Sequence, residues 1–282
     1  MLNHTFHHLP GIGASTERRL WEAGITDWDR FTAPYPLQLS AEKGALLTGL
    51  LQESRRQLEN SNPGFFAKRL PASLHWRLFP AFRPAAVYLD IETTGLDRQH
   101  DQITTIALYD GRAVSWFVNG RNLDDFPAAL ERYSIIISYN GKSFDVPVIE
   151  KHFGLHLPQA HIDLRYILAA LGFRGGLKGC ERALGMGRGD LDGVDGYFAV
   201  LLWKDYIQNN NPRALETLLA YNIQDVISLE PLMVTAYNLN LRGTPFAEGQ
   251  LPLPEPPRPS LQPCRKTIAK IIRAHYPLGR VI

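Results

Sequence analysis

Two carboxylates, Asp90 and Glu92, stand two residues apart in the largely apolar run 87–96. Side chains alternate along an extended strand, so these two project from one face while Leu89 and Ile91 turn to the other. Carboxylates buried side by side repel each other, and a bound cation relieves that repulsion. Since their oxygens are hard ligands, the pair predicts a site for Mg²⁺ or Mn²⁺ rather than zinc. A solvated surface strand is the alternative.

A third carboxylate, Asp145, follows the β-branched run 135–137 and the turn at Asn140 and Gly141. This order predicts a buried strand, a glycine turn and a helix that carries Asp145 in its first turns. A carboxylate at a helix start is also stabilised by the helix dipole, so a purely structural charge is the other interpretation.

The fourth carboxylate, Asp225, lies in a segment, 213–229, whose leucine, isoleucine and valine residues recur at helical spacing. Tyr221 precedes it by four residues, which places both side chains on one face of the predicted helix. Tyrosine and aspartate pairs of this spacing also occur at the rims of ordinary amphipathic helices.

In this order, the three segments resemble the motifs of DEDD-type exonucleases, ribonuclease H-like 3′→5′ nucleases that include the proofreading domains of polymerases. The residue four before Asp225 is Tyr221, and the residue five before it is Ala220 rather than histidine. The resemblance is therefore to the tyrosine branch of these enzymes.

Segments 177–185, 188–193 and 202–206 are similar to the link between the second and third motifs of the YprB-like predicted prokaryotic exonucleases. The whole resemblance covers roughly residues 85–238.

The resemblance implies five catalytic residues and two divalent cations, Mg²⁺ or Mn²⁺. In a two-metal mechanism the cations lie ~3.5–4 Å apart and stabilise the attacking and leaving oxygens of an in-line displacement at phosphorus. The Tyr221 hydroxyl would orient the attacking water. The implied metal ligands are Asp90, Glu92, Asp145 and Asp225.

The resemblance also implies substrate contacts in the first two motifs. Gly95 would let the sugar-phosphate approach closely, and Leu96 would act as a wedge between the last two bases, although a simple strand-ending turn is the alternative for residues 93–96. Lys142 would be a phosphate partner. The implied substrate-binding residues are Thr93, Thr94, Gly95, Leu96, Asn140, Lys142 and Phe144.

The surrounding pattern predicts an α/β fold. Residues 103–109 and 114–118 are predicted to be strands joined by an Asp-Gly turn, and 135–138 a further strand after a helix near 124–133. We expect a ribonuclease H-like mixed central sheet flanked by helices, with a small all-helical N-terminal region.

In the N-terminal region, residues 8–25 resemble the second half of a helix-hairpin-helix. In that motif a glycine-rich turn presents backbone amides to a nucleic-acid phosphate. A small helical packing module is the alternative. A further helix is predicted over 41–59.

The predicted division of the chain has four parts. The last combines a proline-rich stretch with basic residues and no acid after residue 263, and is either a nucleic-acid contact or a solvated tail. The parts are a helical region over 1–60, a linker over 61–84, the exonuclease domain over 85–238, and the proline-rich linker with basic tail over 239–282.

The chain of 282 residues is 45% hydrophobic, enough to bury a full core, and its net charge of +2 is too small to predict nucleic-acid binding by itself. Cys180 and Cys264 form no spaced ligand motif, so no zinc site is indicated. Free thiols and the lack of a leader or long apolar span predict a cytoplasmic protein without membrane contact.

The sequence therefore predicts a metal-dependent 3′→5′ exonuclease whose partner is the 3′ end of single-stranded DNA or RNA. Two alternatives remain. One is a nucleic-acid-binding or scaffold module without turnover, and the other is a structure-specific endonuclease that uses the same cations. The sequence gives no indication of protein partners.

Overall fold

The computed structural model describes residues 1–35, 37, 39–95, 97, 101–187, 196–255, 257 and 261–275. The predicted wedge, Leu96, and the segment 188–193 of the family resemblance lie outside these residues.

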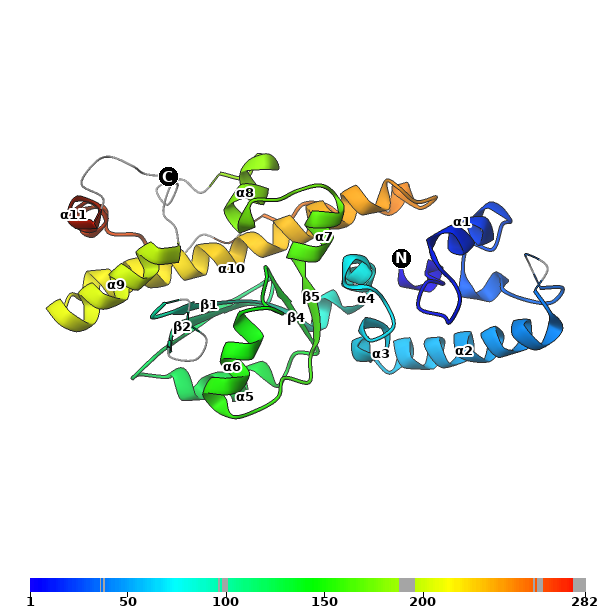
Figure 1. The fold of residues 1–282 in the computed structure, drawn as a ribbon, viewed down its shortest axis with the longest axis horizontal. Coiled ribbons are helices and arrows are strands. Elements are labelled where there is room, and N and C mark those ends of the chain that lie inside the picture. The colour runs from blue at the N-terminus through cyan, green and yellow to red at the C-terminus, as the bar shows by residue number, and fades with distance from the viewer. Residues whose placement is uncertain are drawn as a thin grey trace.

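A five-stranded mixed sheet, in the order β3-β2-β1-β4-β5, lies at the centre of the molecule (Figure 1). The central strand β1 pairs antiparallel with β2, which pairs antiparallel with β3, whereas β4 and β5 are parallel to β1. The strands are β1 (Ala86–Thr93), β2 (Ile103–Tyr109), β3 (Val114–Val118), β4 (Ile135–Ser138) and β5 (Ala160–Asp163).

The predicted strands 103–109, 114–118 and 135–138 are confirmed with these bounds, and so is the mixed sheet with flanking helices. The four-residue strand β5 was not predicted. The helix expected near 124–133 is shorter, because a 3-10 turn η6 (Leu123–Asp125) precedes the single-turn helix α5 (Phe126–Leu130).

Alternation along β1 divides the core into two layers. Val87, Leu89 and Ile91 belong to a hydrophobic cluster with side chains of α5 and of α6 (Asp145–Phe153). Ala86 and Tyr88 face the opposite layer, which includes residues of the long helix α10 (Pro212–Leu241). Asp90 and Glu92 continue this second set, so they project toward α10.

Helix α10 crosses the sheet and is accompanied by shorter helices along its length (Figure 1). The predicted helix 213–229 is confirmed and continues to Leu241, because its apolar periodicity is maintained by buried residues such as Leu232, Met233 and Tyr237. The accompanying helices are α7 (Leu164–Ala170), α8 (Gly176–Ala183) and α9 (Gly196–Asn209).

The N-terminal region is helical, as predicted, and helix 41–59 has the expected bounds. Before α1, the chain forms only a three-residue 3-10 turn, so no α-helix among the described residues precedes the turn that resembles the second half of a helix-hairpin-helix, and that motif stays a prediction. The elements are η1 (Leu2–His4), α1 (Ala14–Glu22), η2 (Trp28–Arg30) and α2 (Ala41–Glu59).

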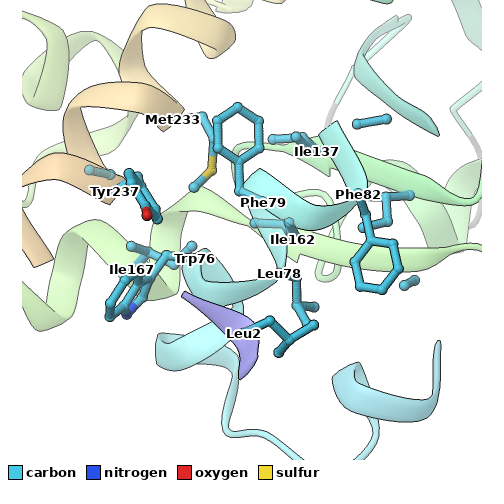
Figure 2. Close-up of a cluster of buried hydrophobic side chains, with 14 of the residues drawn as sticks. Leu2, Trp76, Leu78, Phe79, Phe82, Ile137, Ile162, Ile167, Met233 and Tyr237 are labelled. Carbon is cyan, nitrogen blue, oxygen red and sulfur yellow. The ribbon is translucent and has the colours of Figure 1, made fainter. Parts of the chain in front are cut away.

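The stretch 61–84, predicted to be a linker, is instead part of the folded core. Its aromatic residues provide the reason, since Phe66, Trp76, Phe79 and Phe82 are buried. Figure 2 shows this layer, in which Trp76 meets Tyr237 of α10 with ring centroids 5.7 Å apart. The stretch forms α3 (Pro63–Ala67), η4 (Ala72–Leu78), α4 (Phe79–Phe82) and η5 (Arg83–Ala85).

The C-terminal part returns along α10. After η8 (Ala247–Gly249), the Leu251 amide donates to Asn238 Oδ1 at 2.8 Å, and the Cys264 amide donates to Thr217 Oγ1 at 3.0 Å. The basic segment then forms α11 (Arg265–His275), whose Ile271 is buried. Within the described ranges, no helix has both the length and the apolar character needed to cross a bilayer.

A buried ion pair joins the N-terminal region to the rest of the core. Glu17 Oε1 accepts from the amides of Phe6 and His7, at 2.7 and 3.0 Å, and from Arg77 Nη1 at 2.8 Å. The Glu17 and Arg77 side chains are 2% and 6% exposed, so neither charge is solvated well on its own.

We expect Glu17→Gln to lower the free energy of unfolding by about 3–5 kcal/mol, because it leaves the Arg77 charge buried without its counter-ion. Urea denaturation measures this loss. The exposed Glu22, on the same helix, gives the control Glu22→Gln. Equal small changes in the two variants would contradict the importance of the pair.

Candidate active site

Three carboxylates meet where β1 faces α10. Ligand oxygens of Asp90, Glu92 and Asp225 all lie within 4.8 Å of one another. Asp90 is half-buried, and Glu92 and Asp225 are buried. The alternation of β1 and the helical spacing of α10 therefore bring together acids that are more than 130 residues apart in the sequence.

Asn222 connects these two elements at the carboxylate cluster. Its Nδ2 donates to Asp90 Oδ2 at 2.6 Å, and its Oδ1 accepts from Thr105 Oγ1 of β2 at 3.0 Å. Because Asn222 lies one turn before Asp225 on α10, the same helical turn positions one carboxylate and orients another.

Asp145 borders the cluster from the other side of β1. It is the first residue of α6, is 5% exposed, and its Oδ1 accepts from the Ile91 amide at 3.2 Å. Ile91 stands between Asp90 and Glu92, so this bond fixes Asp145 beside the pair. The cluster of three does not include it.

Burial and nearby negative charges disfavour ionisation of Asp90 and Asp145. Burial, followed by the charges of Asp225, Glu92 and Asp145, raises the pKa of Asp90 well above its ordinary value, and the hydrogen bond from Asn222 opposes that change. Burial also raises the pKa of Asp145 to about 7, although the amides of Asp145 and Ile91 lower it.

The donor set fits hard divalent cations. All the ligand atoms are carboxylate oxygens, which suit Mg²⁺ or Mn²⁺. A cation would also relieve the repulsion that disfavours ionisation of Asp90. Asp90, Glu92 and Asp225 would hold it, with Asp145 adjacent.

Tyr221 lies one turn before Asp225 but is almost fully buried. Its ring packs among residues of α9 and α11, including Phe198 and Ile271, and its hydroxyl accepts from Lys178 Nζ of α8 at 2.6 Å. The ammonium also lies 4.6 Å from the ring centroid, a cation–π distance.

The turn that follows β1 is held by Asp101. Thr94 Oγ1 donates to Asp101 Oδ1 at 2.7 Å, and the Thr93 hydroxyl donates to the Gly95 carbonyl. A Cβ on Gly95 would lie 2.5 Å from Asp101 Oδ2. A larger residue at position 95 would therefore displace the Asp101 carboxylate, which occupies the space that was predicted for the substrate backbone.

The turn that follows β4 is held by Asp163 at the end of β5. Asp163 accepts from the amides of Asn140 at 2.7 Å and Lys142 at 3.1 Å. Asn140 has a positive φ of 67°, and its Oδ1 accepts from Arg165. Phe144 packs, partly buried, against the hydrophobic layer of α5 and α6.

Lys142, predicted to be a phosphate partner, directs its ammonium inward instead. Its Nζ lies 3.4 Å from His75 Nδ1 in η4, and burial lowers the pKa of Lys142. η4, which was expected to be a linker, packs against the turn and provides this polar partner, and the phosphate contact of Lys142 stays a prediction.

Three residues that position this site were not predicted from the sequence to belong to it. Asn222 was visible as a polar residue on the apolar side of a helix, one turn from Asp225. Lys178 lies in a segment noted for its family resemblance, without any indication of its contact. Asp163 gave no signal, because the strand that carries it was not predicted.

A comparison with protein families identifies the fold. The model of the RNase_H superfamily matches residues 87–237, which is more than half of the chain. The chain belongs to the ribonuclease H superfamily. The mixed sheet flanked by helices is thus the ribonuclease H-like fold that was predicted, and it is a fold of nuclease-type hydrolases.

Two solved structures align with part of this chain. A family B DNA polymerase from the hyperthermophilic archaeon Pyrobaculum calidifontis aligns over 55% of this chain and 26% of its own, with 17% identity and a TM-score of 0.41. Brucella melitensis NrnC with bound Mg²⁺ aligns over 57% of this chain and 76% of its own, with 20% identity and a TM-score of 0.40. A comparison with curated proteins gave no match.

The raised pKa values predict how the ribonuclease H-like site affects stability. Asp145 binds its proton more tightly in the folded chain, so without cations its contribution to stability is present at low pH. That contribution is lost as pH rises from the unfolded value of 3.8 through about 7. Melting temperatures in EDTA should therefore fall less over this range for Asp145→Asn than for the unsubstituted protein.

The exposed Asp124 provides the control Asp124→Asn. His8 and His161, whose pKa values burial lowers to about 3, change stability in the opposite direction, but equally in all three proteins. Parallel curves for Asp145→Asn and the unsubstituted protein would contradict the raised pKa.

Proposed function

We propose that the protein is a metal-dependent 3′→5′ exonuclease of the tyrosine branch of the DEDD type, acting on single-stranded DNA or RNA. The observation that carries this proposal is the convergence of Asp90, Glu92 and Asp225 within 4.8 Å, with Asp145 beside them. These are the four acids of the family motifs, in the order and on the elements that the resemblance implies.

The reaction is hydrolysis of the terminal phosphodiester bond. A water oxygen forms a bond to phosphorus, the bond from phosphorus to the 3′ oxygen of the preceding nucleotide breaks, and that oxygen takes up a proton. The products are a nucleoside 5′-monophosphate and a strand shortened by one nucleotide. When bound, two divalent cations stabilise the attacking and leaving oxygens of this displacement.

The protein's own residues supply position and charge. Asp90, Glu92, Asp145 and Asp225 would hold the cations, and Asn222 fixes the orientation of the Asp90 carboxylate. Tyr221 orients the attacking water, and Lys178, through its 2.6 Å hydrogen bond, positions the Tyr221 hydroxyl.

The central test uses oligonucleotides of DNA and RNA, single- and double-stranded and labelled at the 5′ end, with Mg²⁺ or Mn²⁺. We expect a ladder that shortens from the 3′ end of single strands. Asp90→Asn should reduce turnover by about 10³-fold or more, since the loss of a cation ligand removes several kcal/mol of transition-state stabilisation.

The exposed Asp124→Asn should retain full turnover. Full activity of Asp90→Asn would contradict the ligand assignment. Internal cuts instead of a ladder would favour the endonuclease alternative, and binding without turnover would favour the scaffold alternative.

The roles of Tyr221 and Lys178 predict coupled effects on rate. Tyr221→Phe should slow turnover by about 10²-fold, less than Asp225→Asn, because it removes an orienting group and no ligand. If Lys178 acts through Tyr221, Lys178→Met should cause a similar loss and the double variant should lose little more. Multiplied losses in the double variant would show that the two residues act independently.

A further inference from the structure

A cavity of about 450 Å³ opens beside the turn that follows β4. Its size lies within the range of ~300–1,000 Å³ found for small-molecule sites. Asn140 forms one side, and Gly175 and Gly176, at the start of α8, form another. Both glycines have positive φ angles, 99° and 74°.

The charged lining of this cavity is entirely positive. Arg165 and Arg174 contribute to its wall, and none of the described residues that line it is acidic. Both arginines are exposed to solvent, so an incoming anion can reach them. Guanidinium groups present several N–H donors in a plane that matches phosphate, which indicates an anionic ligand.

The cavity also has two aromatic side chains, Tyr139 and Phe173. Aromatic faces bind nucleobases by stacking, and this contact does not depend on which base is present. Cationic and aromatic groups in one cavity of this size therefore favour a nucleotide over a bare phosphate ion.

Two connections place this cavity next to the carboxylate cluster. β4 is parallel to β1, with Ile137 beside Tyr88, so the turn after β4 lies at the same end of the sheet as Asp90. On the other side, Gly176 begins α8, and Lys178 of that helix bonds to Tyr221.

One buried carboxylate, that of Asp163, fixes the cavity wall at Arg165 relative to the turn that follows β4. Asp163 Oδ1 accepts from the Asn140 amide at 2.7 Å and from the Arg165 amide at 3.0 Å, and Asp163 is 1% exposed. The Arg165 guanidinium in turn donates to Asn140 Oδ1. The position of Arg165 relative to the turn that leads to Asp145 is thus determined by the fold.

We infer that this cavity binds the nucleotide of the substrate strand that lies next to the scissile phosphate, with Arg165 and Arg174 on its phosphate and the aromatic side chains beside its base. The inference rests on the proposed nuclease function for the identity of the ligand. It adds a second nucleotide subsite, in which Tyr139 and Asn140 of the second motif are joined by residues of α7, the α7–α8 connection and the start of α8, and these elements lie outside the three sequence motifs.

Arg174→Gln tests the subsite, with Arg112→Gln as the matched control. Arg112 is also exposed, but it lies in the turn between β2 and β3, and because β2 is antiparallel to β1 this turn is at the opposite end of the sheet. Fluorescence anisotropy of a 5′-labelled single-stranded oligonucleotide in EDTA measures affinity without turnover.

We expect Arg174→Gln to raise the Kd about tenfold and to reduce the slope of log Kd against log salt by about 0.7, the value for one lost phosphate contact on a single strand. Arg112→Gln should change neither quantity. In competition experiments, a 5′-phosphorylated dinucleotide should bind the unsubstituted protein more tightly than a mononucleotide, and Arg174→Gln should remove most of that advantage.

Equal effects of the two variants, or an unchanged dinucleotide advantage in Arg174→Gln, would overturn the subsite. The outcomes are separable from the proposed function. If the protein cleaves 3′ ends and Arg174→Gln leaves its affinity unchanged, the subsite alone is refuted. If Arg174→Gln selectively weakens binding but the unsubstituted protein has no turnover, the subsite is supported and the exonuclease function is refuted.

Discussion

Mutual repulsion among buried carboxylates is the constraint to which the rest of the structure responds. Asp90 and Glu92 come from one strand face, and α10 adds Asp225 within 4.8 Å. Such a group is unfavourable unless something compensates it, because the neighbouring carboxylates, together with burial, raise the pKa of Asp90. The fold compensates in part with neutral donors, the Asn222 amide on Asp90 and the Ile91 amide on Asp145. The repulsion that these donors do not offset favours binding of a divalent cation. The same repulsion lowers the stability of the fold when no cation is bound.

The elements that carry the acids could be predicted from sequence because their patterns are local. Two-residue alternation identifies the face of β1, and helical spacing identifies the face of α10. The partners of these acids could not be predicted, because hydrogen bonds across 50 or 130 residues leave no periodic signal. Asp163 illustrates the limit, since β5 has only four residues and contains a histidine. The 61–84 stretch was misread for a related reason: its proline and glycine start indicated a connection, whereas its aromatic residues are buried by tertiary packing.

The N-terminal region supports, through this same stretch, the end of the sheet at which the acids lie. Within η4, Arg77 donates a hydrogen bond to the Glu17 carboxylate of α1. His75, also in η4, contacts both the Lys142 ammonium and the His161 carbonyl of β5. The turn after β4 is therefore packed from behind by elements that precede the sheet in sequence. Truncation before β1 would expose that turn, so the first 84 residues are better regarded as part of the fold that supports the acids than as an appended module.

The long helix α10 determines how the acids are aligned with one another. Its 30 residues span roughly 45 Å at 1.5 Å per residue. The middle of the helix supplies Asn222 and Asp225, while Tyr237, near its C-terminal end, packs against Trp76. A slip of α10 by a single residue would rotate every side chain by about 100° and turn Asp225 away from β1. The aromatic contact between Trp76 and Tyr237 thus helps to fix the rotation of α10 about its axis. Packing at a distance from the acids in this way helps to keep Asp225 facing β1.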